Sequence, residues 1–482
     1  MKHLTNRRAI GYGRGVDAVC LVLLFRRRRR IGRRDQLPLL ERQPVLGRVY
    51  LHLWFTRENP RIHKMRFALI STHIDQTTGY SKVAYNLVRQ IATLAPRVKL
   101  FHFGFQRHPS RQSLRKYPDG VVSYDAAANE EPREEGFGFN KIHEYMETVN
   151  PDVVMIYNDP IIVCRFIESM KHEPGKSPYK LWVYLDQVYD GIAPPLLATI
   201  QTHADRVYAF TSFWKSKLPT FPDVRVLEHA VDPLTFTSLP EEARTTLRAG
   251  LGVPEDGVVF LNANRNSQRK RHDLAIAAFA QLQARYPDKP LYLLIATNAN
   301  PQAGAHYDIL RIHQTELARL GLPETVYAPR LLLIDTSPNA NLLTDDAVNQ
   351  LYNVADIGIN ASDGEGFGLC QLEHLYAGAP QVVADTGNFK TILNDSVAAF
   401  VEPRDRAYFA GAMPLGLWAP VFLTDDVAAA MEKVMKNLPA YKAAAKAFQF
   451  KSWSTVCDGL LEDILNHQAG DQVAIATVPV LS

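Results

Sequence analysis

Two glutamates, Glu365 and Glu373, lie eight positions apart around a Gly-Phe-Gly in the stretch ASDGEGFGLCQLEHLYAGAPQVVADTG (361–387). If a helix begins near Gly368, Glu373 lies in its second turn and Glu365 in the loop before it. Free N–H groups at a helix start attract anions, phosphate above all. Because a carboxylate beside that phosphate would be repelled, we expect the glutamates to bind neutral hydroxyls, such as those of a ribose and a sugar. The alternative is a glycine-rich turn before a surface helix, with both glutamates solvated.

A second group of candidate residues is basic. The stretch NANRNSQRKRHD (262–273) carries Arg265, Arg269, Lys270 and Arg271 at the end of a predicted strand. Arginine offers a planar fork and lysine a compact point charge, and both suit a pyrophosphate. The alternative is a solvated basic loop that precedes a helix, an interpretation that we favour for Arg269 and Arg271.

Short apolar strands position both groups. The unbroken apolar run MRFALIST (65–72) predicts a buried parallel strand, and the periodicity of 79–96 predicts a helix after it. Further strands are predicted at 98–105, 152–158, 180–186, 206–212, 224–230, 258–264, 291–298, 356–362 and 381–385. Short strands that alternate with helix-like segments or loops are typical of parallel α/β units.

The α/β pattern restarts after a Pro-rich linker near 233–257, which indicates two similar halves. In open parallel sheets, ligands bind outside the carboxyl ends of the strands. Glu365, Arg265 and Gly79 each follow a predicted strand. We therefore expect all three to face the cleft between the halves.

Composition limits the class of protein. A chain of 482 residues predicts two or three domains, and 46% apolar with 22% charged residues is typical of globular proteins. The four cysteines show neither CxxC nor Cys-His spacing, so neither a disulfide framework nor a zinc site is indicated. A reducing compartment, and hence a cytoplasmic location, fits best.

The positive charge is confined to the first part of the chain. Residues 1–64 hold 16 Lys and Arg against 4 Asp and Glu, whereas the remainder carries an excess of acidic residues. Because a folded domain with a basic face is lacking, we expect no nucleic-acid partner. The apolar run 18–25 before RRRRR (26–30) is too short to cross a bilayer. We interpret 1–64 as a disordered extension, translated from upstream of a natural start at Met65; the alternative is a basic patch that contacts an anionic membrane surface.

Taken together, these stretches resemble the glycosyltransferases of family 4, the group 1 retaining transferases with the GT-B fold. The E-x7-E signature is present as Glu365 and Glu373, and the family's Arg with a Lys five residues later is present as Arg265 and Lys270. The flanking stretches that resemble the family are VRVLEHAVDPLTF (224–236), LLTDDAVNQLYNVADIGINAS (342–362) and KSWSTVCDGLLEDIL (451–465). The resemblance covers Met65 to about Asn466.

The resemblance implies an α/β protein of GT-B architecture, in which two Rossmann-like domains face each other across a cleft and a C-terminal helix crosses back to the first domain. The expected segments are a basic, disordered extension at 1–64, an N-terminal acceptor domain at 65–240, a C-terminal nucleotide-sugar donor domain at 241–450, a crossing-back helix at 451–467 and a tail at 468–482.

The activity implied by the resemblance is transfer of a sugar from a nucleotide-sugar donor to an unidentified acceptor, which could be a glycan, a lipid or a protein, with retained anomeric configuration. Glu365, Arg265 and Lys270 would be the catalytic residues. Glu365 would lie beside the donor sugar, and the two cations would neutralise the pyrophosphate as the glycosidic bond breaks. Fixed cations can stabilise such charge without a metal ion, so no metal or other cofactor is expected.

The resemblance also assigns donor-binding residues. Glu373 would hold the ribose hydroxyls, and Gly79 would lie near the donor phosphates. The backbone that would line the sugar and phosphate belongs to Gly366, Phe367, Gly368 and Leu369. Many family members have a histidine near the reaction centre of the first domain, but this sequence reads YLDQVYDG (184–191) there. Asp186 or Asp190 would take its place on the acceptor side, or the role would be absent.

Three alternatives remain. A sugar-nucleotide 2-epimerase shares the cleft, although the context of E-x7-E argues against it. A degenerate GT-B protein would bind a sugar nucleotide or a partner without turnover. The arginine-rich extension keeps a nucleic-acid tether open, which deletion of 1–64 and binding at moderate salt would test.

Overall fold

The computed structural model describes residues 64–337, 343–409 and 417–476, which belong to one compact unit. The first 63 residues, which include nearly all of the predicted basic extension with its proposed membrane contact, lie outside the described residues, as do 477–482 of the predicted tail.

The first sheet has seven parallel strands in the order β3-β2-β1-β4-β5-β6-β7. The strands are β1 (Met65–Thr72), β2 (Val98–Phe105), β3 (Val122–Asp125), β4 (Val153–Asn158), β5 (Lys180–Leu185), β6 (Arg206–Ala209) and β7 (Val224–Val226). The strand order reverses between β1 and β4, and the segments that follow β1 and β4 lie on either side of that point. In open α/β sheets this switch point is where ligands bind.

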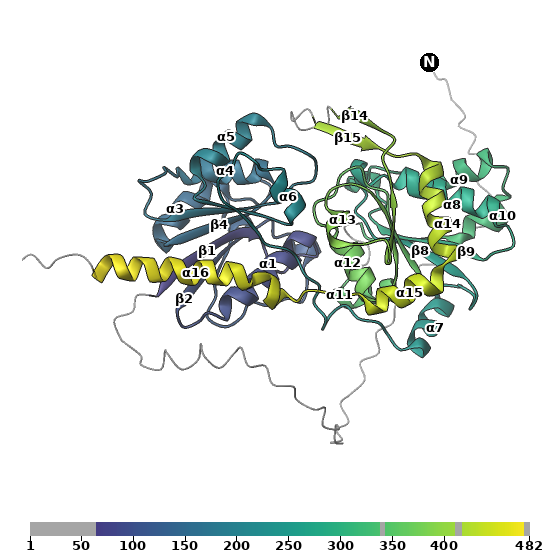
Figure 1. The fold of residues 1–482 in the computed structure, drawn as a ribbon, viewed down its shortest axis with the longest axis horizontal. Coiled ribbons are helices and arrows are strands. Elements are labelled where there is room, and N and C mark those ends of the chain that lie inside the picture. Colours follow the sequence, from purple (N-terminus) through teal and green to yellow (C-terminus); the bar gives the residue numbers. More distant parts are fainter. Residues whose placement is uncertain (1–63, 338–342, 410–416, 477–482) are drawn as a thin grey trace, which may run out of the picture. The chain divides into compact units, whose positions relative to one another are not determined.

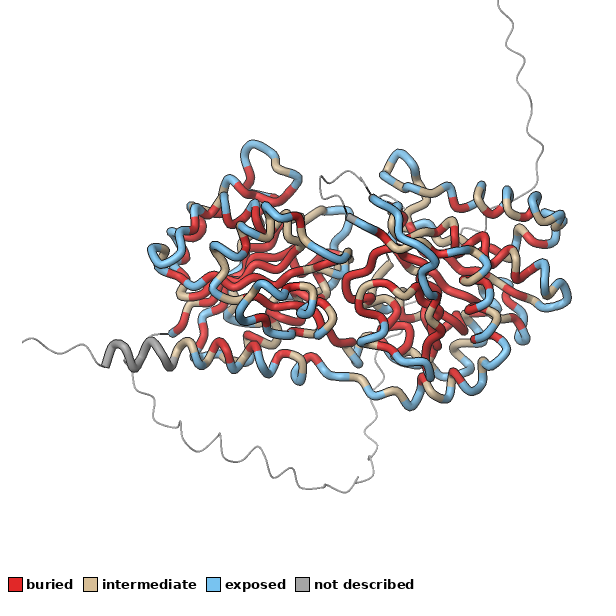
Figure 2. Tube along the Cα trace, turned by 45° about the horizontal axis from the view of Figure 1, so that its top comes forward, coloured by how far each residue is buried: buried red, intermediate tan, exposed pale blue. Residues whose placement is uncertain are grey.

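The second sheet has six parallel strands in the order β10-β9-β8-β11-β12-β13. The strands are β8 (Val258–Asn262), β9 (Leu291–Thr297), β10 (Leu331–Asp335), β11 (Ile357–Asn360), β12 (Gln381–Ala384) and β13 (Ala398–Val401). Its switch point lies between β8 and β11, and the segments that follow these two strands carry the basic and the acidic candidate residues respectively. Most strand residues of both sheets are buried, as the red segments of Figure 2 show.

Helices flank both sheets. They are α1 (Gly79–Ala92), α2 (Ala126–Asn129), α3 (Phe139–Val149), α4 (Pro160–Met170), α5 (Pro194–His203), α6 (Ser212–Ser216), α7 (Glu241–Gly250), α8 (His272–Arg285), α9 (Ile309–Arg319), α10 (Glu324–Tyr327), α11 (Asp345–Val354), α12 (Leu369–Tyr376), α13 (Phe389–Ile392), α14 (Thr424–Lys436), α15 (Leu438–Ala447) and α16 (Trp453–Ala476). In the second half, α8 packs against α9 and α14, while α11 packs against α12 on the other side of the sheet (Figure 1).

The last helix returns to the first sheet. Helix α16 packs against α1, as Figure 1 shows in yellow beside the purple helix. The Asp463 carboxylate accepts a hydrogen bond from Tyr208 at 2.8 Å and pairs with Arg206 at 2.9 Å, both on β6. The predicted crossing back is therefore present, although the helix ends later than expected. Within the described ranges, no helix is both long and apolar enough to span a membrane.

The predicted strands are all present, and apart from β7, in which only Val224 is buried, they have apolar runs that the sheet buries. The sequence did not reveal β3, β10 and β13, nor the antiparallel hairpin of β14 (Asp405–Phe409) and β15 (Leu417–Val421). Strand β3 is largely exposed or half-buried, so it lacks the apolar run that marks a buried strand. The prediction of two similar parallel α/β halves is confirmed.

Candidate functional site

A glycine-rich loop, residues 361–368, joins β11 to α12. Gly368 caps α12 with φ at 87°, in the left-handed region that glycine adopts without strain. A Cβ atom at this position would lie 2.4 Å from a ring carbon of Phe389. The helix therefore starts at Leu369, as the sequence predicted, and it places Glu373 in its second turn.

The glycine-rich loop lies directly against the first half of the protein. A Cβ atom on Gly366 would be 2.4 Å from Oδ1 of Asp186, the residue that follows β5. The indole N–H of Trp214 donates to the Gly366 carbonyl at 2.8 Å. At the start of α1, a Cβ on Gly79 would be 3.8 Å from Cδ1 of Leu369. The structure thus brings together the loop, Gly79 and Asp186.

Glu365 is buried within a ring of donors. The Lys270 ammonium donates to its Oε2 atom, Asn360 Nδ2 donates to the same oxygen at 3.1 Å, and the Arg269 guanidinium lies 3.9 Å away. Burial opposes ionisation of this carboxyl group, but Lys270 and Arg269 more than compensate and lower the pKa of Glu365 to about 2. Glu365 is therefore a carboxylate at neutral pH.

Lys270 is buried at the end of a short 3₁₀ turn (Gln268–Lys270) that follows β8. Its ammonium also donates to Asn264 Oδ1 at 3.1 Å. Burial lowers the pKa of Lys270 to about 8, against the opposing effect of Glu365. The lysine therefore still carries its charge at pH 7, in contact with the carboxylate that shares its site.

The three arginines of this segment differ in their surroundings. Arg265 is exposed, and its side chain forms no hydrogen bond or ion pair with the described part of the chain. Arg269, which we expected to be solvated, is half-buried and donates to the Gly364 carbonyl. That expectation was wrong because the tertiary fold places the glycine-rich loop over Arg269. Arg271 pairs with Asp273 at 2.8 Å, which is compatible with a structural role beside the helix start.

Glu373, the second glutamate of the signature, is also buried, with only 3% of its side chain exposed. Lys82 donates to Oε1 at 2.7 Å and to Oε2 at 2.9 Å, and the Tyr352 hydroxyl donates to Oε2 at 2.9 Å. Sequence reasoning missed both partners. The position of Lys82, three residues after Gly79 in the first turn of α1, was the one available signal, because α1 follows a strand end.

The two candidate aspartates of the first half have different surroundings. Oδ1 of Asp186 is buried without a hydrogen-bond partner among the described residues. Burial is the main cause that raises the pKa of Asp186 to about 7, while a hydrogen bond from Tyr80 and the charge of Arg269 oppose it. Asp190 instead has 62% of its side chain exposed and pairs with Lys217 at 2.8 Å.

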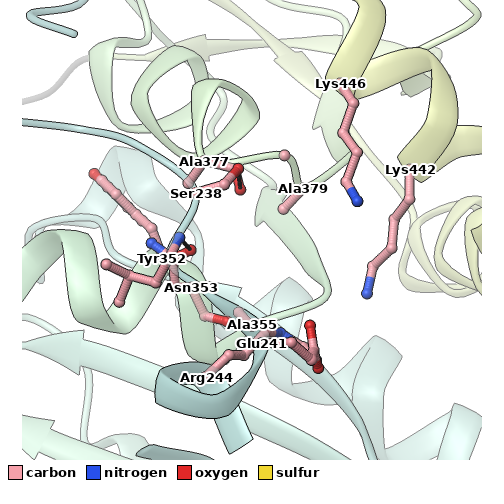
Figure 3. Close-up of a pocket in the computed structure, with 12 residues that line it drawn as sticks. Ser238, Glu241, Arg244, Tyr352, Asn353, Ala355, Ala377, Ala379, Lys442 and Lys446 are labelled. Atoms are coloured by element: carbon pink, nitrogen blue, oxygen red, sulfur yellow. Dashed lines mark hydrogen bonds and ion pairs between the residues drawn. The ribbon is translucent and has the colours of Figure 1, made fainter. Parts of the chain in front are cut away.

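Two cavities lie near these residues. One, of about 220 Å³, is lined by Phe367 together with His229, whose ring nitrogens are both without partners among the described residues. The other, of about 100 Å³, lies beside Tyr352, and Lys442 and Lys446 extend from α15 toward it (Figure 3). Neither cavity is lined by either glutamate of the signature.

Residues 255–414 match the family model described as "Glycosyl transferases group 1". They form a group 1 glycosyltransferase domain. This domain contains β8 to β13 and all the charged candidate residues of the second half, from Arg265 to Glu373. The resemblance carried by E-x7-E and by the Arg265 and Lys270 pair is thereby confirmed.

Several curated proteins similar to this chain are named D-inositol 3-phosphate glycosyltransferase. A D-inositol 3-phosphate glycosyltransferase of Geodermatophilus obscurus is 31% identical over 225 residues, which cover 45% of this chain and 47% of that protein. The protein of the same name from Saccharomonospora viridis is 28% identical over 270 residues, covering 55% of this chain and 56% of that protein. The chain thus spans about half the length of the curated relatives it matches.

Solved structures show that the fold extends beyond the group 1 domain. Sucrose-phosphate synthase from Thermosynechococcus elongatus aligns over 86% of this chain and 100% of its own, with a TM-score of 0.59 at 15% identity. Anabaena HepE in complex with UDP and glucose aligns over 86% and 100%, with a TM-score of 0.51 at 14% identity. An E. coli trehalose-6-phosphate protein bound with UDP-2-fluoro glucose aligns over 86% and 99%, with a TM-score of 0.54 at 12% identity. The chain has the GT-B fold of two Rossmann-like halves.

Proposed function

We propose that this protein transfers a sugar from a nucleotide-sugar donor to an acceptor hydroxyl with retained anomeric configuration. The observation that carries the proposal is the pair of buried glutamates, Glu365 and Glu373, one on each side of the start of α12 and each bonded to a lysine. A buried charge destabilises the folded state unless it is paired, and buried charged groups of this kind are concentrated at functional sites.

The pyrophosphate of the donor would lie between the start of α12 and the loop after β8. The backbone of Gly366, Phe367, Gly368 and Leu369 surrounds the helix start, where free N–H groups favour anions. Arg265 supplies an exposed cation without a partner among the described residues, and Lys270 supplies a second, buried one. We propose that these cations stabilise the charge that develops on the leaving diphosphate, without a metal ion.

The neutral parts of the donor would contact the carboxylates. Glu373 would accept hydrogen bonds from the ribose hydroxyls, and Glu365 would lie beside the sugar. Gly79 would lie near the donor phosphates, since it faces Leu369. Two proteins of the same fold were solved with UDP or a UDP-sugar, which supports a nucleotide sugar as the partner.

On the acceptor side, we place Asp186 in the site, because its unpartnered Oδ1 lies against Gly366 of the glycine-rich loop. A hydroxyl of the sugar or of the acceptor could donate to this oxygen. Asp190 is not included, because its exposed carboxylate already pairs with Lys217. The acceptor is a glycan, a lipid or a protein. A cytoplasmic location, with peripheral membrane contact through residues 1–64, belongs to the same proposal and rests on the cysteine spacing and the basic segment.

The proposal is tested by titrating the full chain with UDP, GDP, ADP and their glucose conjugates, with calorimetry for binding and product analysis for donor hydrolysis. We expect one nucleotide series to bind, and a ligand at 100 times its Kd to stabilise the fold by about 2.7 kcal/mol. Glu373→Gln should weaken binding at least about tenfold, the equivalent of roughly 1.4 kcal/mol. Glu144→Gln is the matched control, because Glu144 is exposed on the outer face of α3, and it should bind like the wild type.

Two results would argue against a transferase. If no nucleotide binds, or if Glu373→Gln binds as tightly as the wild type, the donor site is misplaced. If a nucleotide binds at Glu373 but no donor is hydrolysed or transferred to any hydroxyl acceptor, the protein is a nucleotide-sugar binding module that has lost turnover.

A further inference from the structure

Lys82 is hydrogen-bonded to Glu373, the residue that the proposed function assigns to the ribose of the donor. Its ammonium donates to both oxygens of Glu373, at 2.7 Å and 2.9 Å. Burial alone lowers the pKa of Lys82, but the carboxylates of Glu373 and Asp345 outweigh burial and raise the pKa above its ordinary value. Lys82 is therefore a cation at neutral pH. Its hydrogen bonds use much of the acceptor capacity of the Glu373 carboxylate.

The remaining capacity of Glu373 is too small for a ribose. A carboxylate offers about four acceptor positions, two on each oxygen. Lys82 uses one on each oxygen, and the Tyr352 hydroxyl uses the second on Oε2 at 2.9 Å. One position is left, on Oε1, whereas a ribose diol that binds through both hydroxyls needs two. The diol and the ammonium therefore compete for the same carboxylate.

Lys82 has a second carboxylate within reach. Oδ1 of Asp345, in the first turn of α11, lies 3.8 Å from the ammonium. Arg115 holds this aspartate in place with hydrogen bonds of 3.0 Å and 2.7 Å to its two oxygens. The ring of Phe236 lies under the ammonium at 4.5 Å. A rotation of the lysine side chain would exchange Glu373 for Asp345 without leaving the cation unpaired.

We propose that Lys82 is a donor-displaced cation: it neutralises Glu373 and moves to Asp345 when the ribose of the donor binds. This inference rests on the proposed function, because it requires Glu373 to be the ribose ligand. It identifies Asp345 as a residue that sets donor affinity without contacting the donor. It also gives the buried Glu373 carboxylate a cationic partner before the donor arrives, which partly offsets the burial that raises the pKa of Glu373.

The test compares Asp345→Asn with the wild type, using whichever of UDP, GDP and ADP the full chain binds. Removing the second carboxylate should weaken binding about three- to tenfold, because the displaced ammonium loses its partner. The 2′,3′-dideoxy form of the same nucleotide cannot displace Lys82 through its ribose, so its affinity should not change. Asp346→Asn is the matched control, because Asp346 is an exposed acid in the same helix turn.

A double-mutant cycle separates Lys82 from Arg115, which also loses a partner in Asp345→Asn. In a Lys82→Met background, Asp345→Asn should no longer affect nucleotide binding, whereas any effect through Arg115 would persist. Thermal unfolding of each variant establishes that it is folded. If Lys82→Met does not fold, the comparison of ribose and dideoxyribose nucleotides in Asp345→Asn decides alone.

Equal weakening of the ribose and dideoxyribose nucleotides, or no weakening by Asp345→Asn, would overturn the inference while leaving the proposed function intact. If the wild type binds none of the three nucleotides, the proposed function fails first and the inference falls with it. The two failures are therefore distinguishable.

Discussion

The carboxyl group of Asp186 should make the stability of this protein fall as pH rises. Its Oδ1 is buried without a partner among the described residues, and burial raises its pKa from 3.8 to about 7. In the unfolded chain the pKa of an aspartate is about 3.9. Between these two pKa values the folded protein retains a proton that the unfolded chain has lost. The contribution of Asp186 to the unfolding free energy is therefore complete below the pKa of the unfolded state. It is lost as pH rises through the pKa of the folded state.

The size of the effect follows from the difference between the two pKa values. Each pH unit between them costs about 1.4 kcal/mol of unfolding free energy. From pH 5 to pH 8, the Asp186 carboxyl should therefore destabilise the fold by roughly 2 to 3 kcal/mol. Asp186→Asn keeps the shape of the side chain but removes its titration. The unfolding free energy of this variant, measured relative to the wild type, should therefore be roughly 2 to 3 kcal/mol higher at pH 8 than at pH 5.

Urea unfolding at pH 5 and pH 8, followed by tryptophan fluorescence, measures this gain from the shift of the midpoint at constant slope. Asp190→Asn is the matched control, because that carboxylate is four residues away and exposed. It should change stability by no more than about 0.5 kcal/mol, as surface substitutions usually do. If Asp186→Asn and the wild type differ equally at both pH values, the carboxyl group is ionised throughout and our account of its burial is incorrect.

Two further predictions concern the glycine-rich loop and the buried ion pair. Lys270→Met should lower the unfolding free energy by about 3 kcal/mol, because it leaves the buried Glu365 carboxylate with a neutral amide and a guanidinium that is 3.9 Å away. Glu365→Gln in the same chain should recover most of that loss in a thermal unfolding assay. Unchanged stability of the single variant would show that the pair is dispensable. Gly366→Ala should weaken nucleotide binding at least about tenfold in calorimetry, roughly 1.4 kcal/mol, because a Cβ would lie 2.4 Å from Asp186 Oδ1, so that either the loop or the Asp186 side chain beside it must shift. Wild-type affinity in a folded Gly366→Ala protein would mean that the loop does not line the donor.

Part of the site was predictable, because apolar runs in the sequence mark the strands and therefore the residues that follow each strand end. Glu365 and Lys270 are 95 residues apart, yet both were placed at one sheet edge, since each follows a strand and parallel strands end at the same edge. Their direct contact was not predictable. The sequence indicated a pyrophosphate as the partner of Lys270, whereas the structure shows the Glu365 carboxylate in contact with it.

The protein's two halves, its strand ends and the residue types at those ends were determined by the sequence, because apolar runs and glycine turns act locally. Tertiary structure alone decided which charges meet. Lys82 reaches Glu373 from a position 291 residues earlier, and the loop at Gly366 covers Asp186 from the other half. Such pairings depend on how the two sheets are placed against each other, and burial then sets the charge of each group.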